Sequence, residues 1–194
     1  MTKSRLIFAL AATGLLAATS AQADQANGWF ANASAGTAHY TATVDGLGSG
    51  TDNDAAFIVN AGWRDQRILG VEVGYTDLGS VSANDGAGSR AKLSGDGWTL
   101  GLNGHFNPTA HWFISARGGA FQWKLHAKAT LADVDGTETF RGSEQSLDWY
   151  AGVGTGYDID QHWGIGANFD YYKMAKHGAD VGTRIFSISA EYRF

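Results

Sequence analysis

Cysteine is absent from the chain, proline occurs once, and residues 24–194 hold no apolar run of membrane-helix length. Without cysteine there are no disulfide bridges and no thiol chemistry. Because a membrane-spanning helix needs about 20 apolar residues, a helical membrane protein is excluded. The 27 glycines follow no triplet repeat, which excludes collagen. Glycine at this level is instead typical of β proteins with many turns and crowded backbones.

The N-terminus has the layout of a secretory signal peptide. Lys3 and Arg5 give a positive start, which is followed by an apolar run and by small residues up to Ala23. Such leaders are removed during export, so we expect a cleaved signal peptide at 1–23 and one domain at 24–194. Without the leader the chain has 12 basic and 19 acidic residues, a net charge of −7. We therefore expect no nucleic-acid partner.

Apolar and polar residues alternate with a period of two in eight segments of the domain. This alternation predicts β-strands with one apolar face. Five of these runs are long enough for the roughly 9–11 residues that a tilted membrane strand needs. The fifth segment carries aromatic residues on both faces, so its facing stays open. The alternating segments are 29–37, 57–63, 69–76, 98–103, 112–123, 147–157, 163–171 and 186–194.

The connections between these segments alternate in length. Tight turns are expected at 65–67, 107–110 and 158–161. The other connections are longer, polar and glycine-rich. Short turns on one side and long loops on the other are typical of outer-membrane barrels, whose long loops face the exterior. The expected extracellular loops are residues 44–54, 78–92, 126–146 and 175–181.

Aromatic residues gather at both ends of the expected strands. Two such girdles flank the apolar band of a membrane barrel because indole and phenol rings prefer the interface. The alternative is a soluble β-sandwich with an aromatic core. At the short-turn rim we expect Trp29, Trp63, Phe106, Trp112, Tyr157, Trp163 and Phe194, and at the other rim Tyr40, Tyr75, Trp98, Trp149 and Tyr171.

Charged residues of the clearly alternating segments fall on the face opposite the apolar one. Arginine or lysine at the lipid midplane would cost about 2–4 kcal/mol, so we infer that the apolar face points outward. The predicted fold is an all-β, eight-stranded antiparallel up-and-down transmembrane β-barrel. Eight strands leave an interior that side chains fill. We therefore expect a packed polar plug rather than an open pore.

Buried charges in such a plug must be paired and hydrogen-bonded. We hypothesise an ion pair between Glu72 and Arg117, which both fall near mid-height. The network is either structural or a gate that opens briefly to small ions, and channel activity unchanged in Glu72→Ala and Arg117→Ala would contradict the gate. The other residues expected in this interior network are Asn103, Asn168, Asp170 and Asp148.

Two segments resemble the transmembrane domain of the outer membrane protein A family. Residues 70–79, GVEVGYTDLG, look like its third strand, and residues 187–194, SISAEYRF, look like its closing strand. The resemblance implies an eight-stranded barrel in the outer membrane. It also implies that Tyr192 and Phe194 form the C-terminal signal for the barrel-assembly machinery. The family's peptidoglycan-binding domain is not expected here.

The resemblance also bears on the possible gate. In that family a glutamate of the third strand forms a gating salt bridge with basic residues of neighbouring strands, and Glu72 matches that glutamate. The partners differ, because Asn103 and Asn168 fall about where the family has basic side chains. Gly156 falls about where the family has a second acid. Arg117 is then the interior cation expected to remain.

An enzyme that modifies lipid A is a further class to weigh, because small outer-membrane barrels include acyltransferases and deacylases. This chemistry needs a nucleophile and a base near the outer rim. The sequence has no compact His–Ser motif, so we expect no enzyme and no cofactor. His111 and His162 each precede a tryptophan and are expected to be interface residues rather than metal ligands. The residues near the rim are His126, Ser143, Ser146 and Asp148.

Together these patterns predict an integral outer-membrane protein of a Gram-negative bacterium with a structural or surface-interaction role. At most it would form a narrow, gated channel of low conductance, and a small-solute or ion porin is the alternative. Expected partners are outer-membrane lipids and lipopolysaccharide, the barrel-assembly machinery, and host cells or phage through the loops. We expect a monomer with both termini in the periplasm.

Overall fold

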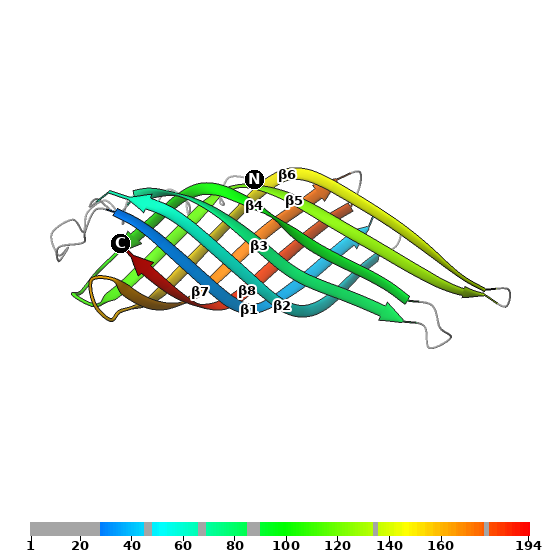
Figure 1. Cartoon of the computed structure of the whole chain (residues 1–194), viewed down its shortest axis with the longest axis horizontal. Helices are drawn as coiled ribbons and strands as arrows, with labels where there is room; N and C mark the ends of the chain where they lie inside the picture. Colours follow the sequence, from blue (N-terminus) through cyan, green and yellow to red (C-terminus); the bar gives the residue numbers. More distant parts are fainter. Residues whose placement is uncertain (1–27, 45–47, 66–68, 85–89, 134–135, 177–178) are drawn as a thin grey trace, which may run out of the picture.

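A computed structural model describes residues 28–44, 48–65, 69–84, 90–133, 136–176 and 179–194. Antiparallel strands close into one barrel in sequence order (Figure 1). The predicted fold class is confirmed, whereas the expected signal peptide lies outside the described residues. The eight strands are β1 Gly28–Val44, β2 Gly48–Arg64, β3 Leu69–Asn84, β4 Arg90–Phe106, β5 Trp112–Asp133, β6 Gly136–Asp158, β7 Trp163–Lys176 and β8 Ala179–Arg193.

Pairing between β1 and β8 removes the free edges of the sheet. It runs from Phe30 opposite Arg193 to Val44 opposite Ala179. Closure matters because hydrocarbon offers no water to unpaired backbone groups, so an open edge inside a bilayer would cost several kcal/mol per group. Among the described residues, no helix is long and apolar enough to cross a membrane.

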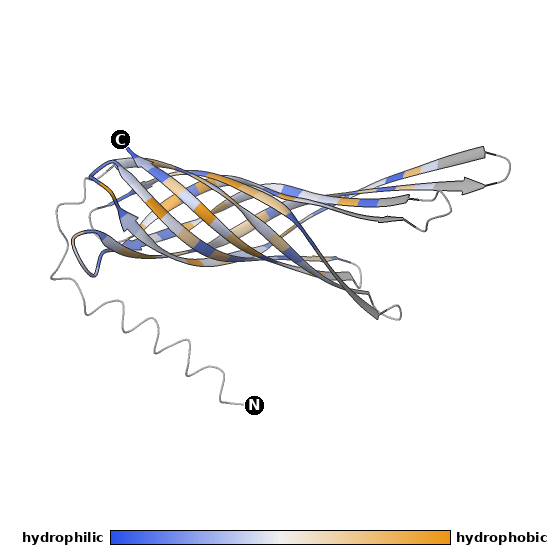
Figure 2. Ribbon diagram, turned by 90° about the horizontal axis from the view of Figure 1, so that it is seen from below, coloured by the Kyte–Doolittle hydropathy of each residue, from blue (hydrophilic) through white to orange (hydrophobic). Residues whose placement is uncertain are grey.

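Exposed and buried residues alternate along the strands and separate an outward from an inward face. Figure 2 shows the corresponding changes between hydrophobic and hydrophilic residues along the ribbon. Outward Val153 is 59% exposed, whereas inward Asp170 is 0% exposed. The open question of the fifth strand is settled in the same way. In β5, Ile114 faces outward, while Arg117 and Phe121 face inward. The apolar parity therefore forms the outer surface of the barrel.

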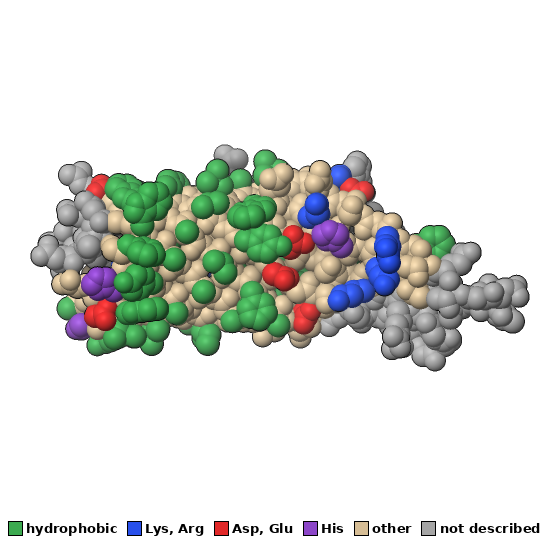
Figure 3. Space-filling model, in the orientation of Figure 1, with side chains coloured by type: hydrophobic (Ala, Val, Ile, Leu, Met, Phe, Trp, Pro, Cys, Tyr) green, Lys and Arg blue, Asp and Glu red, His purple; other side chains and the backbone are tan. Residues whose placement is uncertain are grey.

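Belts of aromatic side chains lie near both ends of the apolar surface (Figure 3). At the short-turn end, Trp29 lies opposite Trp63. At the opposite end of the barrel, the rings of Tyr75 and Trp98 meet edge to face, with centroids 5.3 Å apart. The girdle prediction is therefore confirmed for these residues.

Tyr40 is an exception, because the prediction that it belongs to the outer girdle is wrong. It shares the parity of Ala38, which is fully buried, and its side chain packs against the apolar interior. Its hydroxyl donates a hydrogen bond to the carbonyl oxygen of Leu78. In β1 the odd-numbered residues face outward, so residue 40 must point inward.

The segments expected to be long loops are strand for most of their length. β5 and β6 continue as a paired hairpin to Asp133 opposite Gly136, and β3 and β4 continue to Asn84 opposite Arg90. These hairpin arms project from one end of the barrel (Figure 1). The loop prediction failed because the described part of the β5–β6 arm is exposed on both faces, so apolar alternation ends while backbone pairing continues. The correction applies to 44–54, 78–92, 126–146 and 175–181.

A β-bulge lies just beyond the outer belt, where the β3–β4 arm begins. The register of the pair shifts between Asp77 and Ser80, and Gly79 has a φ of 84°. Glycine suits this left-handed conformation because it has no Cβ. The N–H of Gly79 donates to Asp77 Oδ1 at 2.8 Å, and the N–H of Ser80 donates to Asp54 Oδ2 at 2.5 Å. These carboxylates satisfy backbone donors that the bulge leaves without a ladder partner.

The opposite end of the barrel has tight turns, as predicted. Residues 107–111 join β4 to β5, and residues 159–162 join β6 to β7. In the second turn, Asp160 Oδ1 accepts the backbone N–H groups of Trp163 and His162, both at 2.7 Å. These bonds favour the charged carboxylate and lower the pKa of Asp160. The predicted turn at 65–67 lies largely outside the described residues.

The outward face gives a first test of the fold. We expect Val153→Arg to destabilise the barrel by about 2–4 kcal/mol in phospholipid vesicles, because it places a charge at mid-height in hydrocarbon. Gln122→Arg is the control, since residue 122 lies beside Trp98 of the outer belt, where the cost falls to about 0–1 kcal/mol. Urea unfolding followed by tryptophan fluorescence measures both. Equal losses would contradict the assignment of the lipid-facing surface.

Candidate functional site

The barrel interior, which is the candidate site, has two layers. A polar layer lies toward the tight turns and an apolar layer toward the hairpin arms. The expectation of a polar plug throughout the barrel is therefore wrong for the arm end. Alternation missed the apolar layer because some of its residues stand between apolar neighbours in sequence, as Ile58 stands between Phe57 and Val59.

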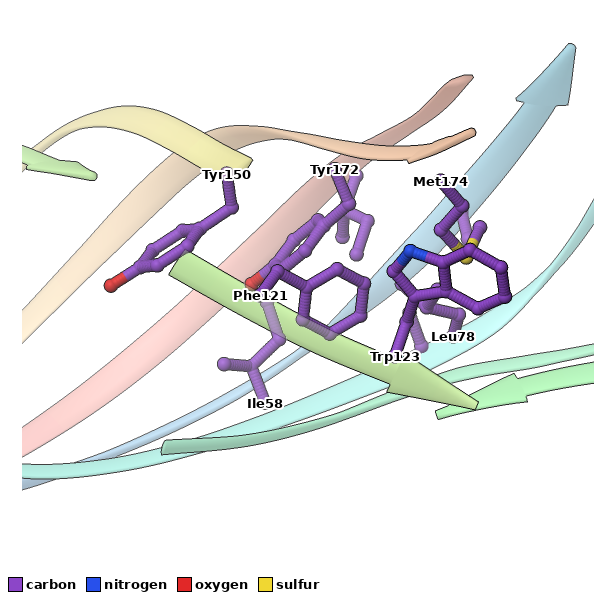
Figure 4. Close-up of a cluster of buried hydrophobic side chains, with 10 residues drawn as sticks. Ile58, Leu78, Phe121, Trp123, Tyr150, Tyr172 and Met174 are labelled. Carbon is purple, nitrogen blue, oxygen red and sulfur yellow. The ribbon is translucent and has the colours of Figure 1, made fainter. Parts of the chain in front are cut away.

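Aromatic rings fill the apolar layer (Figure 4). Phe121 meets Tyr172 edge to face with ring centroids 4.9 Å apart, and Tyr150 stacks on Tyr172 at 5.6 Å. Close packing of this kind leaves few voids as large as a water molecule. This layer closes the barrel axis with apolar groups. Its buried members are Ala38, Ala56, Ile58, Leu78, Phe121, Trp123, Tyr150, Tyr172, Met174 and Ile185.

One ion pair crosses the polar layer between strands that are not neighbours. Arg117 of β5 donates from Nε and Nη2 to the two carboxylate oxygens of Asp170 in β7, both at 2.7 Å. Gly152 of β6 lies between them, opposite both residues in register. A Cβ at Gly152 would overlap the Asp170 carboxylate. Because Gly152 has no side chain, the side chains of Arg117 and Asp170 can meet across β6. Asn60 completes the contact when its amide oxygen faces Arg117 Nη1.

The buried side chain of Glu72 in β3 is also contacted across intervening glycines. Its Oε2 accepts Asn103 Nδ2 at 2.7 Å, and its Oε1 accepts the Tyr150 hydroxyl at 2.9 Å. Gly101 and Gly119 occupy the same row between Glu72 and Tyr150. Because neither glycine fills the row, the tyrosine of β6 reaches the glutamate of β3.

The hypothesised ion pair between Glu72 and Arg117 is replaced by the pair between Arg117 and Asp170. Both predicted residues are inward and close enough to interact electrostatically. However, Arg117 shares its row with Asp170, whereas Glu72 shares its row with Tyr150. A bidentate contact forms along the shared row, because the intervening glycine leaves room for it.

A larger charge network lies nearer the tight turns. Arg64 donates to both oxygens of Glu191 at 2.7 Å and to Asn103 Oδ1 at 2.6 Å. Arg193 donates to Glu191 Oε1 at 3.1 Å and also pairs with Asp158. Since Asn103 also binds Glu72, hydrogen bonds run from mid-height to the turn end of the barrel.

Histidine and asparagine side chains close this network at its turn end. Asn107 Nδ2 donates to Asp158 Oδ2 at 2.6 Å, and His105 Nε2 lies 3.4 Å from the same oxygen. The His105 ring also stacks on Phe113, with centroids 4.3 Å apart. Each buried charge of the network thus has a partner, as burial in a narrow barrel requires.

Sequence reasoning found only part of this network. The charge pattern placed Glu191 and Arg193 on the inward face, as the structure has them, but it missed Arg64 and the contacts that join these residues. The signal was available for Arg64, since it continues the inward parity of Asn60 and Gly62 by one step. Asp158 was expected in a turn, where a charge needs no partner.

A small cavity remains in the polar layer. It has a volume of about 30 Å³ and is lined by Asn32, Glu72, Arg117 and Asn168, among others. A cavity needs about 10–15 Å³ of volume for each water molecule, so this one has room for about two waters. Asn168 lines this cavity, which places it in the interior as predicted. Its amide oxygen occupies the position that a Cβ at residue 154 would overlap.

Asp148 lies away from the predicted network. Its Oδ2 accepts the indole N–H of Trp123 at 2.8 Å and the backbone N–H of Ala175 at 2.9 Å. These contacts hold β5, β6 and β7 together near the arm end. Asp148 therefore belongs to the boundary of the apolar layer, because it lies two residues beyond Tyr150 in β6.

Only two of the four residues weighed for lipid-A catalysis come together. His126 and Ser143 lie opposite each other on the outward parity of β5 and β6. Ser146 and Asp148 have the inward parity of β6, so they lie on the other side of the sheet. The His126 ring instead has Asp96 as its partner, with Nδ1 3.5 Å from Oδ1. A nucleophile–base arrangement also needs a third group that orients the base, and Asp148 lies on the face opposite His126, which prevents that contact.

The two histidines next to tryptophans sit at the turn-end rim. His111 Nδ1 contacts the carbonyl oxygen of Asp158 at 2.9 Å, and its ring stacks on Tyr157 at 5.2 Å. His162 stacks on Tyr192 at 6.0 Å. Among the described residues, no three His, Asp or Glu side chains gather in a way that could hold a metal ion.

The last residues of β8 lie on the outside of the same rim. The Tyr192 ring meets Phe194 edge to face at 5.0 Å and Trp163 at 4.9 Å. The N–H of Phe194 donates to the carbonyl oxygen of Trp29 at 3.0 Å, which carries the β1–β8 closure to the last residue.

Known proteins of this architecture provide the comparison. The family model for the outer membrane protein β-barrel domain matches residues 8–194. The structure resembles Ail, the attachment invasion locus protein of Yersinia pestis, solved with the heparin analogue sucrose octasulfate. The two are 19% identical with a TM-score of 0.56, over 86% of this chain and 99% of Ail.

Two further solved structures are similar. Neisserial surface protein A is 20% identical with a TM-score of 0.53, over 86% of this chain and 97% of that one. OprG of Pseudomonas aeruginosa is 12% identical with a TM-score of 0.53, over 87% of this chain and 97% of that one. At these identities the likeness concerns the fold. No curated protein sequence matches the chain.

The row through Gly152 gives a test of the interior. We expect Gly152→Ala to destabilise the barrel by about 3–5 kcal/mol, because its Cβ displaces the Asp170 carboxylate and leaves buried charges unpaired. Gly118→Ala is the control. A Cβ there has 3.2 Å to its nearest atom, and we expect a change within about 1 kcal/mol. Urea unfolding in lipid vesicles measures both, and a tolerated Gly152→Ala would contradict the cross-strand pair.

Proposed function

We propose a role for this protein from the premise that the chain belongs to the outer membrane protein β-barrel domain family. The family gives its location as the outer membrane. Within that membrane we assign it a structural and surface-interaction role, with a barrel that is closed at rest. The observation that carries the proposal is the division of the interior into an ion-paired layer and an apolar layer that follow one another along the axis.

The closed interior favours this role over that of a porin. A solute crossing the barrel would have to part the Arg117–Asp170 pair and also displace the rings of Phe121 and Tyr172. Opening one layer leaves the other in place. Barrels that conduct freely have about 16–18 strands and an aqueous channel, whereas eight strands leave only the width of side chains.

A gated ion channel is the second candidate, because the polar layer contains the cavity beside Glu72 and Arg117. Its gate would comprise Glu72, Asn103, Arg117 and Asp170. In this candidate the ion pair breaks transiently, and the aromatic layer must move in the same event. Lipid-A chemistry is less favoured, because its candidate residues lie on opposite faces of β6.

The hairpin arms support the surface-interaction part of the proposal. They extend the sheet beyond the outer aromatic belt, and the β5–β6 arm presents exposed side chains on both faces at 126–128 and 139–145. Ail is by name an attachment and invasion protein, and its structure was solved in complex with a heparin analogue. By analogy of fold, we propose that the arms of this protein face the exterior and contact host surfaces or phage.

Orientation and biogenesis follow from the same proposal. With the arms outside, the tight turns and both termini of the barrel chain face the periplasm of a Gram-negative cell. Residues 1–23 would be removed on export, and Tyr192 and Phe194 would be recognised by the barrel-assembly machinery. We propose a monomer surrounded by outer-membrane lipid and lipopolysaccharide, with no cofactor.

Conductance across planar bilayers tests the proposed closed state. We expect the wild-type protein to show far less conductance than a porin. We also expect Arg117→Gln and Tyr172→Ala, each alone, to conduct like wild type, because each opens only one of two layers in series. The combined variant should conduct measurably more than either.

Heat-modifiable migration on a detergent gel verifies that each variant is folded before recording. Steady wild-type conductance would favour the channel candidate. A rise with Arg117→Gln alone would show that the apolar layer does not block the axis. Mass spectrometry of lipid A from cells that overproduce the protein separates out the enzymatic alternative, for which unchanged lipid A is the expected result.

A further inference from the structure

Three cations stand side by side on the outward face of the sheet that β4, β5 and β6 form beyond the outer aromatic belt. Lys92 of β4 lies opposite Lys128 of β5, and Lys128 lies opposite Arg141 of β6. All three side chains are exposed. Directly opposed residues of a sheet have Cβ atoms about 4.5–5.5 Å apart, and like charges in such positions repel. This basic row therefore costs the isolated protein stability.

The described carboxylates do not neutralise the row. None of its three cations forms an ion pair with a described acidic side chain, although Lys92 lies within electrostatic range of Asp54. Asp96, the acid nearest in β4 on the same face, accepts the Tyr75 hydroxyl at 2.9 Å and faces His126. The row is also not a product of composition, because the whole chain carries a net charge of −5.

An acidic side chain lies on the other face of the β5–β6 arm, where it pairs with a lysine. Glu144 lies at the inward parity of β6 and pairs with Lys176 of β7, with Nζ 2.5 Å from Oε2. Lys124 and His126 share the outward parity of β5 with Lys128. The two lysines of β5, Lys124 and Lys128, therefore extend the row of cations along one strand. Figure 3 shows this basic surface beyond the aromatic belt, toward the arm end.

The height of the row identifies what it faces. Trp98 of the outer belt lies opposite Gln122, and Lys128 is six residues farther along β5. At about 3.3 Å per residue and a tilt of about 40°, the row lies roughly 15 Å above the belt. The outward face at this height borders the head-group sugars of the surrounding lipid. The hydrocarbon ends at the belt, because aromatic rings mark the interface.

We propose that Lys92, Lys128 and Arg141 bind phosphate groups on the head-group sugars of lipopolysaccharide. The row spans about 10 Å, which is two strand spacings, and so accommodates more than one phosphate of the same glycolipid. Arginine binds phosphate through a two-pronged donor, and lysine acts as a point charge. The bound phosphates relieve the repulsion within the row. This inference rests on the proposed outer-membrane role and assigns a lipid partner to the outer surface of the β4–β5–β6 sheet.

Lipopolysaccharide affinity in detergent micelles provides the test. The probe is lipopolysaccharide with its sugar phosphates intact, compared with the same material after dephosphorylation. We expect the triple variant Lys92→Gln, Lys128→Gln, Arg141→Gln to bind the phosphorylated form about tenfold or more weakly than wild type. Wild type should bind the dephosphorylated form as weakly as the triple variant binds the phosphorylated one.

Arg184→Gln is the matched control for Lys128→Gln. Arg184 is also exposed and outward, but it lies on β8, and its neighbours across the strands are His39 and Tyr171. We expect Arg184→Gln to change affinity by less than about twofold, whereas Lys128→Gln, at the centre of the row, weakens it more. If the two variants weaken lipopolysaccharide affinity equally, Lys128 contributes no more than any other exposed cation, which would overturn the proposal.

Other outcomes also decide the question. Unchanged affinity of the triple variant would overturn the proposal. So would a triple variant that loses binding to a soluble sulphated polysaccharide while it keeps lipopolysaccharide, because the row would then serve a soluble polyanion. Thermal stability gives an independent measure, since phosphorylated lipopolysaccharide should raise the Tm of wild type more than that of the triple variant.

Failure of this inference is separable from failure of the proposed function. If the chain is not a membrane barrel, wild type and variants alike will lack heat-modifiable migration. If only the inference fails, all proteins will be heat-modifiable and closed in bilayers, and the triple variant will bind lipopolysaccharide like wild type.

Discussion

The need to hydrogen-bond every backbone N–H and C=O group within hydrocarbon is the constraint on which this structure depends. Eight strands satisfy it by closing β1 onto β8. Closure leaves each strand with one face toward lipid and one toward a narrow interior. Val153 and Asp170 therefore occupy opposite environments although they belong to neighbouring strands. Charges are confined to the inside, where they must find partners in a space only as wide as side chains.

Glycine provides the room that this narrow interior lacks. Opposed residues in adjacent strands are too close for two large inward side chains in every row. Gly152 leaves space for the Arg117–Asp170 pair, and Gly101 leaves space for the Tyr150 hydroxyl beside Glu72. The interior partners are consequently residues two or three strands apart. The same rule makes the ion-paired layer rigid, because each contact depends on the register of an intervening strand.

Backbone pairing continues beyond the membrane, but the constraint on side chains does not. In the described part of the β5–β6 arm both faces are exposed, so charges are free to lie on the outside of the sheet. Lys92, Lys128 and Arg141 lie side by side there, whereas Glu144 lies on the other face with Lys176. Charges thus occupy both faces of the arm, unlike in the membrane band, because the hydrocarbon ends at the aromatic belt.

Sequence alone determined the fold class, the lipid-facing surface and the inward position of Glu72 and Asp170, because parity is a local property of each strand. The facing of the fifth strand, and with it the inward position of Arg117, was decided by the structure. Sequence did not determine the partner of Arg117, since that depends on how three strands are staggered. It placed Tyr40 on the wrong face and missed Arg64 because both lie at the margins of their alternating runs. The apolar layer and the paired arms were also decided only in the closed barrel. There the register between strands, which no single segment encodes, sets which side chains meet.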